Sequence, residues 1–221
     1  MSKEIFHVLQ LTDSSLPTGG FAYSHGIETL INAGKIIDLD TLEKALIAQA
    51  IAIGQAELIG LWTIACADNP KAIFERVCHY LFSFLWEEEV RQSSSLLGRR
   101  LLNIAERFSN EIIYKPKAEE VTYILNGPAA GLVAKPLGVN PLQMAQSFLF
   151  THITQSASAA TRLLGFDSLA VNEIVWHLSD LMREVVEISS SKTLEEISPV
   201  NFELGIAQTR HRYESLRLFR S

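Results

Sequence analysis

The apolar residues of this chain recur at the spacing of an α-helix in every long segment, and this period restricts the fold more than any other feature. No short hairpin turn joins two alternating segments, and no internal repeat is found. We therefore expect an all-α protein, a compact single-domain bundle of about eight to ten helices over residues 1–221. A chain of this length buries roughly 70% of its unfolded surface, so its core needs no disulfide or metal.

Capping signals predict the helix boundaries. Asn69-Pro70 and Asn140-Pro141 each place an N-cap residue before a proline, which predicts helices over 70–84 and 140–164. Asp40 with Glu43 resembles a capping box that opens one helix to about residue 67. The other helices are expected over 4–13, 24–33, 87–108, 127 to about 136, 168–185 and after Pro199, with Ser189–Lys192 as a mobile linker. Small residues predict the close approach of another helix to 40–67: Ala45, Ala48, Ala52, Ala56 and Gly60.

Charge and cysteine content exclude several functions. The net charge is −6 and is spread along the chain, so no basic face for nucleic acid is expected. Cys66 and Cys78 form no CxxC pair and are expected to be buried thiols in a reducing compartment. The N-terminal residues lack the apolar core of a signal peptide. The apolar segment 46–67 contains Glu57, which would be costly in a bilayer, so we expect a core helix in a cytoplasmic protein that enters no membrane.

The stretch over residues 9–30 interrupts the helical pattern with a turn. Pro17 fixes the backbone there, and Gly19-Gly20 permit a positive φ. The aromatic residues Phe21 and Tyr23 follow at once. Aromatic side chains beside a rigid turn are a common interface composition, so we expect this turn to shape a surface for dimerisation or for a partner. The alternative is that both rings fill the core of the monomer.

Candidate catalytic and metal-binding groups do not gather at local spacings. No two of the six histidines lie at i, i+4, and the consecutive residues Glu87–Glu89 point apart on a helix. Ser24 and His25 with Asp13 could supply a nucleophile and a base, but no strand–turn–helix elbow surrounds them. No phosphate-binding loop or dinucleotide fingerprint is present. These observations indicate a non-catalytic protein and leave open a site assembled from distant segments.

Several motifs carry a resemblance to a known family. The N-terminal signature of the urease accessory protein UreF family resembles the pattern Pro17-x-Gly19-Gly20-Phe21-x-Tyr23-Ser24-His25-Gly26-x-Glu28. The middle motif of the family is similar to Glu89-x-Arg91-x-x-Ser94-x-x-x-Gly98-Arg99-Arg100-Leu101-Leu102. Its C-terminus is similar to Arg210-His211-x-x-x-x-x-Arg217-Leu218-Phe219-Arg220-Ser221. The chain departs from the family pattern at Thr18, Ala22, Gly165, Asp167 and Arg212.

The resemblance implies an all-α homodimer that acts in urease maturation. Proteins of this family bind UreD, also called UreH, and recruit the GTPase UreG, and the assembly inserts nickel into the urease apoprotein while GTP is hydrolysed. The resemblance thus implies an adaptor and chaperone, not an enzyme, which holds no cofactor of its own and handles nickel transiently within the complex. The residues that it assigns to partner binding or to the dimer are Pro17, Gly19, Gly20, Phe21, Tyr23, Ser24, His25 and Glu28.

Arg162 is the main candidate for contact with the GTPase. It is the only formally charged residue between 140 and 166, and it lies in the last turn of the expected helix, where it can bond free carbonyls. The family comparison also places a basic residue here, and Arg91 is a second candidate. One alternative is a GTPase-activating protein that supplies such an arginine in trans. Another is an unrelated α-helical hydrolase that uses Ser24 and His25.

The C-terminal residues 209–221 differ in charge from the rest of the chain. They carry four arginines and one glutamate, a net charge of +3 in a chain of −6, together with apolar side chains. A chain end of this composition is expected to order on a partner, which by resemblance is UreD. The expected docking residues are Arg210, His211, Arg217, Leu218, Phe219, Arg220 and Ser221.

Overall fold

The computed structural model describes residues 4–13, 15–85, 88–109, 112–114, 123–198 and 219, apart from the Phe21 side chain. No β-strand occurs in these ranges, which confirms the all-α prediction, and the ten α-helices within them agree with the predicted number. The helices and 3-10 turns are α1 (Glu4–Thr12), η1 (Gly20–Ala22), α2 (Ile27–Asn32), α3 (Leu39–Gln55), α4 (Glu57–Ala65), α5 (Pro70–Phe84), α6 (Glu88–Ser109), α7 (Asn126–Ala134), α8 (Pro141–Leu164), α9 (Ser168–His177), α10 (Ser179–Ser190) and η2 (Leu194–Glu196).

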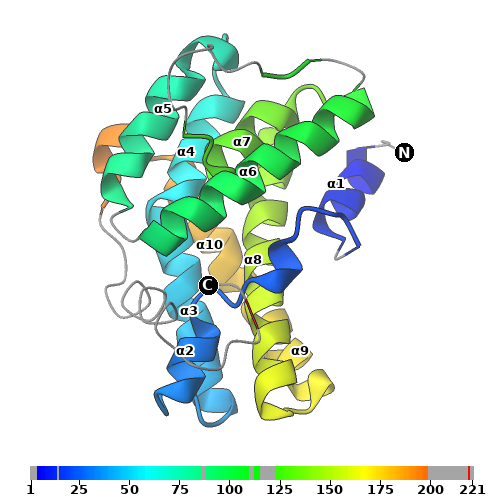
Figure 1. Cartoon of the computed structure of the whole chain (residues 1–221), viewed down its shortest axis with the longest axis vertical. Helices are drawn as coiled ribbons and strands as arrows, with labels where there is room; N and C mark the ends of the chain where they lie inside the picture. Colours follow the sequence, from blue (N-terminus) through cyan, green and yellow to red (C-terminus); the bar gives the residue numbers. More distant parts are fainter. Residues whose placement is uncertain are drawn as a thin grey trace.

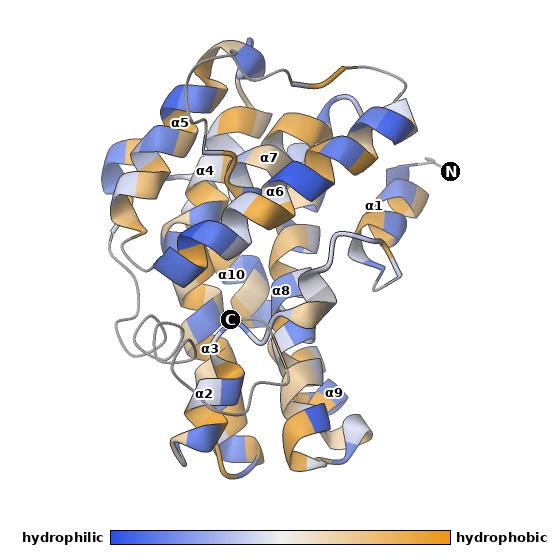
Figure 2. Cartoon of the chain, viewed as in Figure 1, coloured by the Kyte–Doolittle hydropathy of each residue, from blue (hydrophilic) through white to orange (hydrophobic). Residues whose placement is uncertain are grey.

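The helices form a bundle elongated along α8 (Figure 1). α5, α6 and α7 lie toward one end and α2 and α9 toward the other, with α3, α4 and α8 running between them. α1 lies beside α8 at the edge of the bundle, and none of its residues is fully buried. Figure 2 shows apolar and hydrophilic residues alternating along the helices, the pattern of amphipathic helices around a shared core.

α7 is enclosed by its neighbours, and each of its nine residues is buried. Its sequence, NGPAAGLVA, has no polar face, so its helical form depends on the helices that pack around it. α4 makes the closest approach, because a Cβ atom on Gly131 would lie only 2.3 Å from the Leu61 carbonyl oxygen. The predicted stripe of small residues contributes to this contact through Gly60, which faces Pro128 of α7.

A bend at Ala56 separates α3 from α4, so the prediction of one helix over 40–67 is wrong. Ala56 has φ −139° and ψ −72°, outside the helical region. The bend makes Glu57 the first residue of α4, and its carboxylate accepts hydrogen bonds from Ser94 Oγ of α6 (2.8 Å) and from the Gly127 N–H of α7 (2.5 Å). Burial raises the pKa of Glu57, and the two hydrogen bonds oppose that rise.

Most predicted boundaries agree with the structure. α5 and α8 begin at their predicted prolines and end at the predicted residues. The N-cap of α3 is Asp38 rather than Asp40, because the Asp38 side chain accepts a hydrogen bond from the Thr41 N–H (2.9 Å) and Thr41 takes the place expected for Glu43. The helix expected over 168–185 is divided into α9 and α10.

Two smaller predictions are wrong. Ser189 belongs to α10 and not to a linker; it is buried, and its hydroxyl lies 2.8 Å from the Gly54 carbonyl oxygen at the end of α3. A serine is tolerated there because its hydroxyl bonds to main-chain carbonyls. Cys78 is buried as expected, whereas Cys66 is exposed. The helix predicted after Pro199 lies outside the described residues.

None of the described helices is by itself long and apolar enough to cross a membrane. Only α3 and α4 taken together reach that length and composition, and they meet at a bend of 41°. Both carry residues of the protein core, such as Leu46 on α3 and Leu61 on α4.

Replacing Gly131 by Ala should destabilise the protein by about 3 kcal/mol, because the added methyl group would push α7 away from the Leu61 carbonyl. Helix propensity alone predicts the opposite sign, a gain of about 1 kcal/mol. Urea unfolding followed by circular dichroism measures the difference. The control is Gly34→Ala, which meets open space and has only the cost of its positive φ, about 1 kcal/mol. A Gly131→Ala protein that is more stable than the parent would contradict the α4–α7 contact.

Candidate functional site

The turn after α1 is shaped by residues in the left-handed backbone region. Gly19 has φ 80° and Gly26 has φ 88°, values that favour glycine. His25 has φ 50° and is the only residue other than glycine with a positive φ in the part of the chain that the structure describes. Such a conformation costs about 1 kcal/mol or more and persists only where the surroundings compensate for it. The side-chain contacts of His25 must therefore compensate for its backbone conformation.

Helices α6 and α8 hold this turn from two sides. Arg100 of α6 donates from Nη1 to the Thr18 carbonyl oxygen (3.2 Å). Gln155 of α8 lies against Gly20, where a Cβ atom would come within 2.5 Å of Gln155 Nε2. Pro17 is exposed at the tip of the turn. The Gly-Gly sequence therefore permits a close approach to α8 as well as a reversal of the chain.

Four of the predicted partner-binding residues have buried side chains. Tyr23, Ser24, His25 and Glu28 are exposed to only 5%, 0%, 9% and 2%. The expectation that Tyr23 shapes a surface is wrong for the monomer, since its ring packs inward with its centroid 6.1 Å from that of His25. The motif thus builds the interior behind the turn, and the core alternative holds for this ring.

His25 meets His152 of α8, which is distant in the sequence. The centroids of the two imidazole rings lie 5.2 Å apart. His25 Nε2 lies 3.3 Å from Gln155 Oε1, and His152 Nε2 lies 3.4 Å from Asn126 Nδ2 at the start of α7. His152 Nδ1 lies 2.8 Å from the Phe148 carbonyl oxygen one turn earlier in α8. The two rings contact each other, and their separate hydrogen bonds connect this histidine pair to α7 and α8.

The hydrogen bonds fix the tautomers of this pair. A carbonyl oxygen only accepts, so His152 carries its proton on Nδ1 and accepts at Nε2 from the Asn126 amide. His25 donates from Nε2 to Gln155 Oε1. Burial, with a smaller contribution from nearby His152, lowers the pKa of His25 to about 3, and burial also lowers the pKa of His152. Both rings are therefore neutral near pH 7.

The surroundings of the pair do not support catalysis by Ser24 and His25. The buried Ser24 hydroxyl has no hydrogen-bond partner among the residues that the structure describes, so no described hydrogen bond joins it to the imidazole. No three His, Cys, Asp or Glu side chains gather into a metal site among the described residues. A small cavity of about 70 Å³ adjoins the pair, and its wall includes Thr18, Gly20, Leu97, Asn126, His152 and Gln155. The arrangement orders the turn through neutral hydrogen bonds.

A second cluster brings together three residues that the sequence singles out. The Phe219 N–H donates to Glu28 Oε2 (3.1 Å), and the Phe219 ring lies against the Arg162 guanidinium, with Cζ 4.4 Å from the ring centroid. Arg162 Nε also donates to the Ser158 carbonyl oxygen (3.2 Å), as expected for a cation in the last turns of a helix. We call Glu28, Arg162 and Phe219 the Phe219 seat, since there α2, α8 and Phe219 meet.

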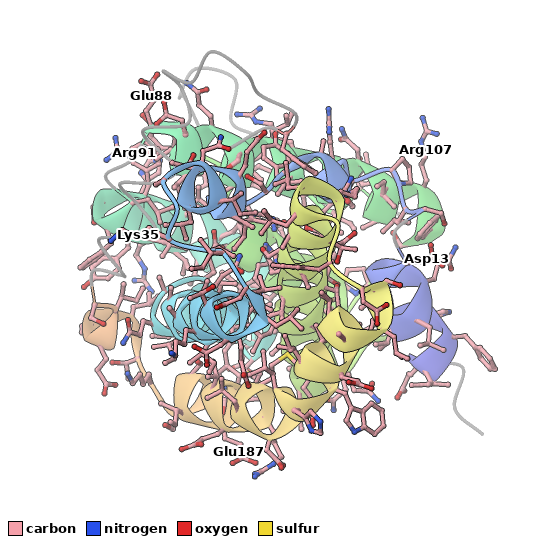
Figure 3. The ribbon with its side chains drawn as sticks, turned by 90° about the horizontal axis from the view of Figure 1, so that it is seen from below. Asp13, Lys35, Glu88, Arg91, Arg107 and Glu187 are labelled. Carbon is pink, nitrogen blue, oxygen red and sulfur yellow. The ribbon has the colours of Figure 1, made fainter. Side chains whose placement is uncertain are left out.

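Arg162 also lies on the wall of a groove of about 350 Å³ between α8 and α9. The groove is otherwise lined mainly by small and hydroxyl side chains, among them Thr12, Thr154, Ser158, Thr161 and Ser168. Arg91 is held elsewhere: its guanidinium stacks on Phe82 (4.4 Å to the ring centroid), and its Nε donates to the Leu85 carbonyl. Figure 3 shows Arg91 at the side of the molecule that also carries Glu88. The two candidate arginines therefore have separate surroundings.

The predicted tail residues and the residues that contact the turn differ in how far the structure describes them. Six tail residues lie outside the part of the chain that the structure describes: Arg210, His211, Arg217, Leu218, Arg220 and Ser221. Sequence reasoning missed Arg100, Asn126, His152 and Gln155 as neighbours of the turn. A signal existed for two of them, because His152 and Gln155 lie at i, i+3 on one face of an otherwise mostly apolar helix.

A family model and the relatives of this chain among known proteins all point to the same family. A sequence model of the family described as UreF matches residues 36–179. The chain is 30% identical to the urease accessory protein UreF of Nostoc sp., over 97% of this chain and 95% of that protein. It is 29% identical to the protein of the same name from Trichormus variabilis, again over 97% and 95%. The corresponding protein of Arthrobacter sp. is 28% identical, over 96% of this chain and 95% of the relative.

The buried His25 should make stability depend on pH. The pKa of this residue is near 6.5 in the unfolded chain and about 3 in the folded one, so below pH 6.5 the unfolded state binds more protons and stability falls with falling pH. Between about pH 7.5 and about pH 5 this residue should account for a loss of about 2 kcal/mol. Urea unfolding at the two pH values measures the loss.

The variant His25→Asn isolates this contribution, because asparagine tolerates a positive φ and does not titrate. Between the two pH values the stability of this variant should fall by about 2 kcal/mol less than that of the parent. His177→Asn, at an exposed position of α9, is the control and should leave the pH dependence unchanged. An unaltered pH dependence in His25→Asn would mean that the imidazole is solvated.

Proposed function

Since this chain belongs to the UreF family of urease accessory proteins, we propose that it works as an adaptor in urease maturation. It bridges UreD, also called UreH, and the GTPase UreG, and couples GTP hydrolysis to nickel insertion into the urease apoprotein. It acts as a cytoplasmic homodimer and not as an enzyme, and nickel is its transient cargo. The observation that carries this proposal is the similarity over nearly the whole chain to proteins named urease accessory protein UreF.

The Phe219 seat supports a link between the two docking regions. Phe219 belongs to the proposed UreD-docking tail, residues 209–221, and it contacts both Glu28 and Arg162. A partner that takes up the Phe219 side chain would therefore change the surroundings of the Arg162 guanidinium. We infer that binding of UreD at the tail and binding of the GTPase at Arg162 influence each other through this contact.

The surroundings of Arg162 favour an adaptor over a GTPase-activating protein. Its guanidinium contacts the Phe219 ring and the Ser158 carbonyl. An activating arginine must instead reach the phosphate oxygens of the GTP bound to the partner GTPase. An arginine supplied in trans raises GTP hydrolysis by roughly three to five orders of magnitude. Hydrolysis by UreG, measured with and without this protein, separates the two functions. If this protein raises the rate of GTP hydrolysis by that amount and the Arg162→Ala variant does not, the protein is a GTPase-activating protein and not an adaptor.

Arg162→Ala should leave the helical content intact and weaken both GTPase binding and urease activation by about tenfold, or roughly 1.4 kcal/mol. Arg162→Lys should recover only part of this, because an ammonium keeps the charge but not the planar contact with the Phe219 ring. Circular dichroism, binding of the purified GTPase and reconstituted urease activation are the three measurements. Arg107→Ala, at an exposed position of α6, is the matched control.

The alternative is that Arg162 only stabilises the end of α8, and this alternative predicts different results for the same variants. In that case Arg162→Ala melts earlier, activation per folded molecule is unchanged, and Arg162→Lys behaves as the parent does. That combination of results would remove Arg162 from the proposed partner surface.

Deletion of residues 211–221 should abolish the complex with UreD and lower the melting temperature by no more than about 4 °C. The small effect is expected because the described contacts of this segment are those of Phe219, of which the contact with Arg162 contributes about 1 kcal/mol. Size-exclusion chromatography with purified UreD tests for the complex, and differential scanning calorimetry measures the melting temperature. A deletion that unfolds the protein would show that the tail belongs to the core.

A further inference from the structure

The outer face of α9 carries two large apolar side chains in contact with solvent. Trp176 is 77% exposed and Leu169 is 66% exposed. They lie seven positions apart, which places them two turns apart on one face of the helix. The opposite face carries Val171 and Val175, both buried against the rest of the bundle. Neither Trp176 nor Leu169 is therefore needed to attach α9 to the core.

Acidic side chains continue this outer face along α10. Asp180, Glu184 and Glu187 are exposed there, and Glu173 lies between the two apolar residues of α9. Figure 3 shows Glu187 pointing away from the bundle. The only basic residue of α9 and α10 other than histidine is Arg183, so four carboxylates and one guanidinium leave a net charge of −3.

Arg183 does not balance the acidic face evenly. Its guanidinium is shared between Asp180, at 3.8 Å, and Glu187, at 2.8 Å. Glu173 lies three positions before Trp176 on α9 and is therefore its neighbour on the helix surface, and Glu184 is an exposed carboxylate on the following helix. The surface thus combines an exposed aromatic face with negative potential.

We propose that the outer face of α9 and α10, formed by Leu169, Glu173, Trp176, Asp180 and Glu184, docks a protein segment that carries arginine beside an apolar side chain. An arginine guanidinium can stack on the Trp176 indole while the neighbouring carboxylates accept its hydrogen bonds. The apolar side chain covers Leu169, and tryptophan and arginine are both enriched among the residues that contribute most to binding energy. The proposal is independent of the proposed function, because this face shares no residue with the Phe219 seat.

The test uses a defined probe and the full chain. A fluorescein-labelled helical peptide with arginine and leucine on one face is titrated with the protein, and its anisotropy gives the affinity. A matched peptide with glutamate in place of arginine should bind about tenfold more weakly or not at all, and added salt should weaken the arginine peptide. Leu169→Ser with Trp176→Ala should weaken binding of the arginine peptide by about tenfold, and so should Glu173→Lys with Glu184→Lys.

Two controls change the same kinds of residue elsewhere. Ile37→Ser removes an apolar side chain that is 66% exposed, and Asp68→Lys reverses an exposed charge; both should leave the affinity unchanged. Since Glu173 and Glu184 are exposed, the charge-reversed protein is expected to fold and gives a result even if the Trp176→Ala protein does not. Absence of binding by the parent, or equal weakening by the control variants, would overturn the proposal.

Discussion

The hydrogen-bonded carboxylate of Glu57 is the contact on which the centre of this protein depends. A carboxyl group in the interior is unfavourable unless it is hydrogen-bonded, and here the hydrogen bonds come from the N-terminus of α7 and from a serine. Ser94 Oγ donates to the carboxylate and accepts from the Asn126 N–H (2.9 Å). Two N–H groups that would otherwise be free at the start of a buried helix are thereby satisfied. One side chain thus fixes α4, α6 and α7 together.

α8 connects this centre to the candidate site. His152, Gln155 and Arg162 lie at i, i+3 and i+10, so they project from one side of the helix. The first two bind the N-terminal turn, and His152 also contacts Asn126, next to the residue that Glu57 holds. Arg162 at the far end contacts Phe219. The N-terminal turn, the start of α7 and Phe219 therefore all contact a single helix, α8.

Local signals predict the helices of this protein well and its contacts less well. The prolines at 70 and 141 set the starts of α5 and α8 because proline at the first turn acts without help from the rest of the fold. The bend at Ala56 could not be predicted, since it interrupts a continuous helical pattern and its visible partner, the Glu57–Gly127 hydrogen bond, joins residues 70 positions apart. The histidine pair escaped prediction for a similar reason, because His152 and Gln155 mark one face of α8 but do not indicate which distant segment packs there. The Pro-Gly-Gly turn was identified correctly, but the burial of Tyr23 depends on how α8 lies against it.

α7 is too short and too apolar to persist as a helix before its neighbours are in place, because isolated helices shorter than about 12 residues are marginal in water. Its bond from Gly127 to Glu57 joins residues 70 positions apart, and closures of that length slow folding. During synthesis α4, α5 and α6 emerge before α7, whereas α8, which also packs against α7, emerges after it. Until α7 is packed, its apolar residues remain exposed to association with other chains. A member of a family of urease accessory proteins therefore passes through a vulnerable stage of its own.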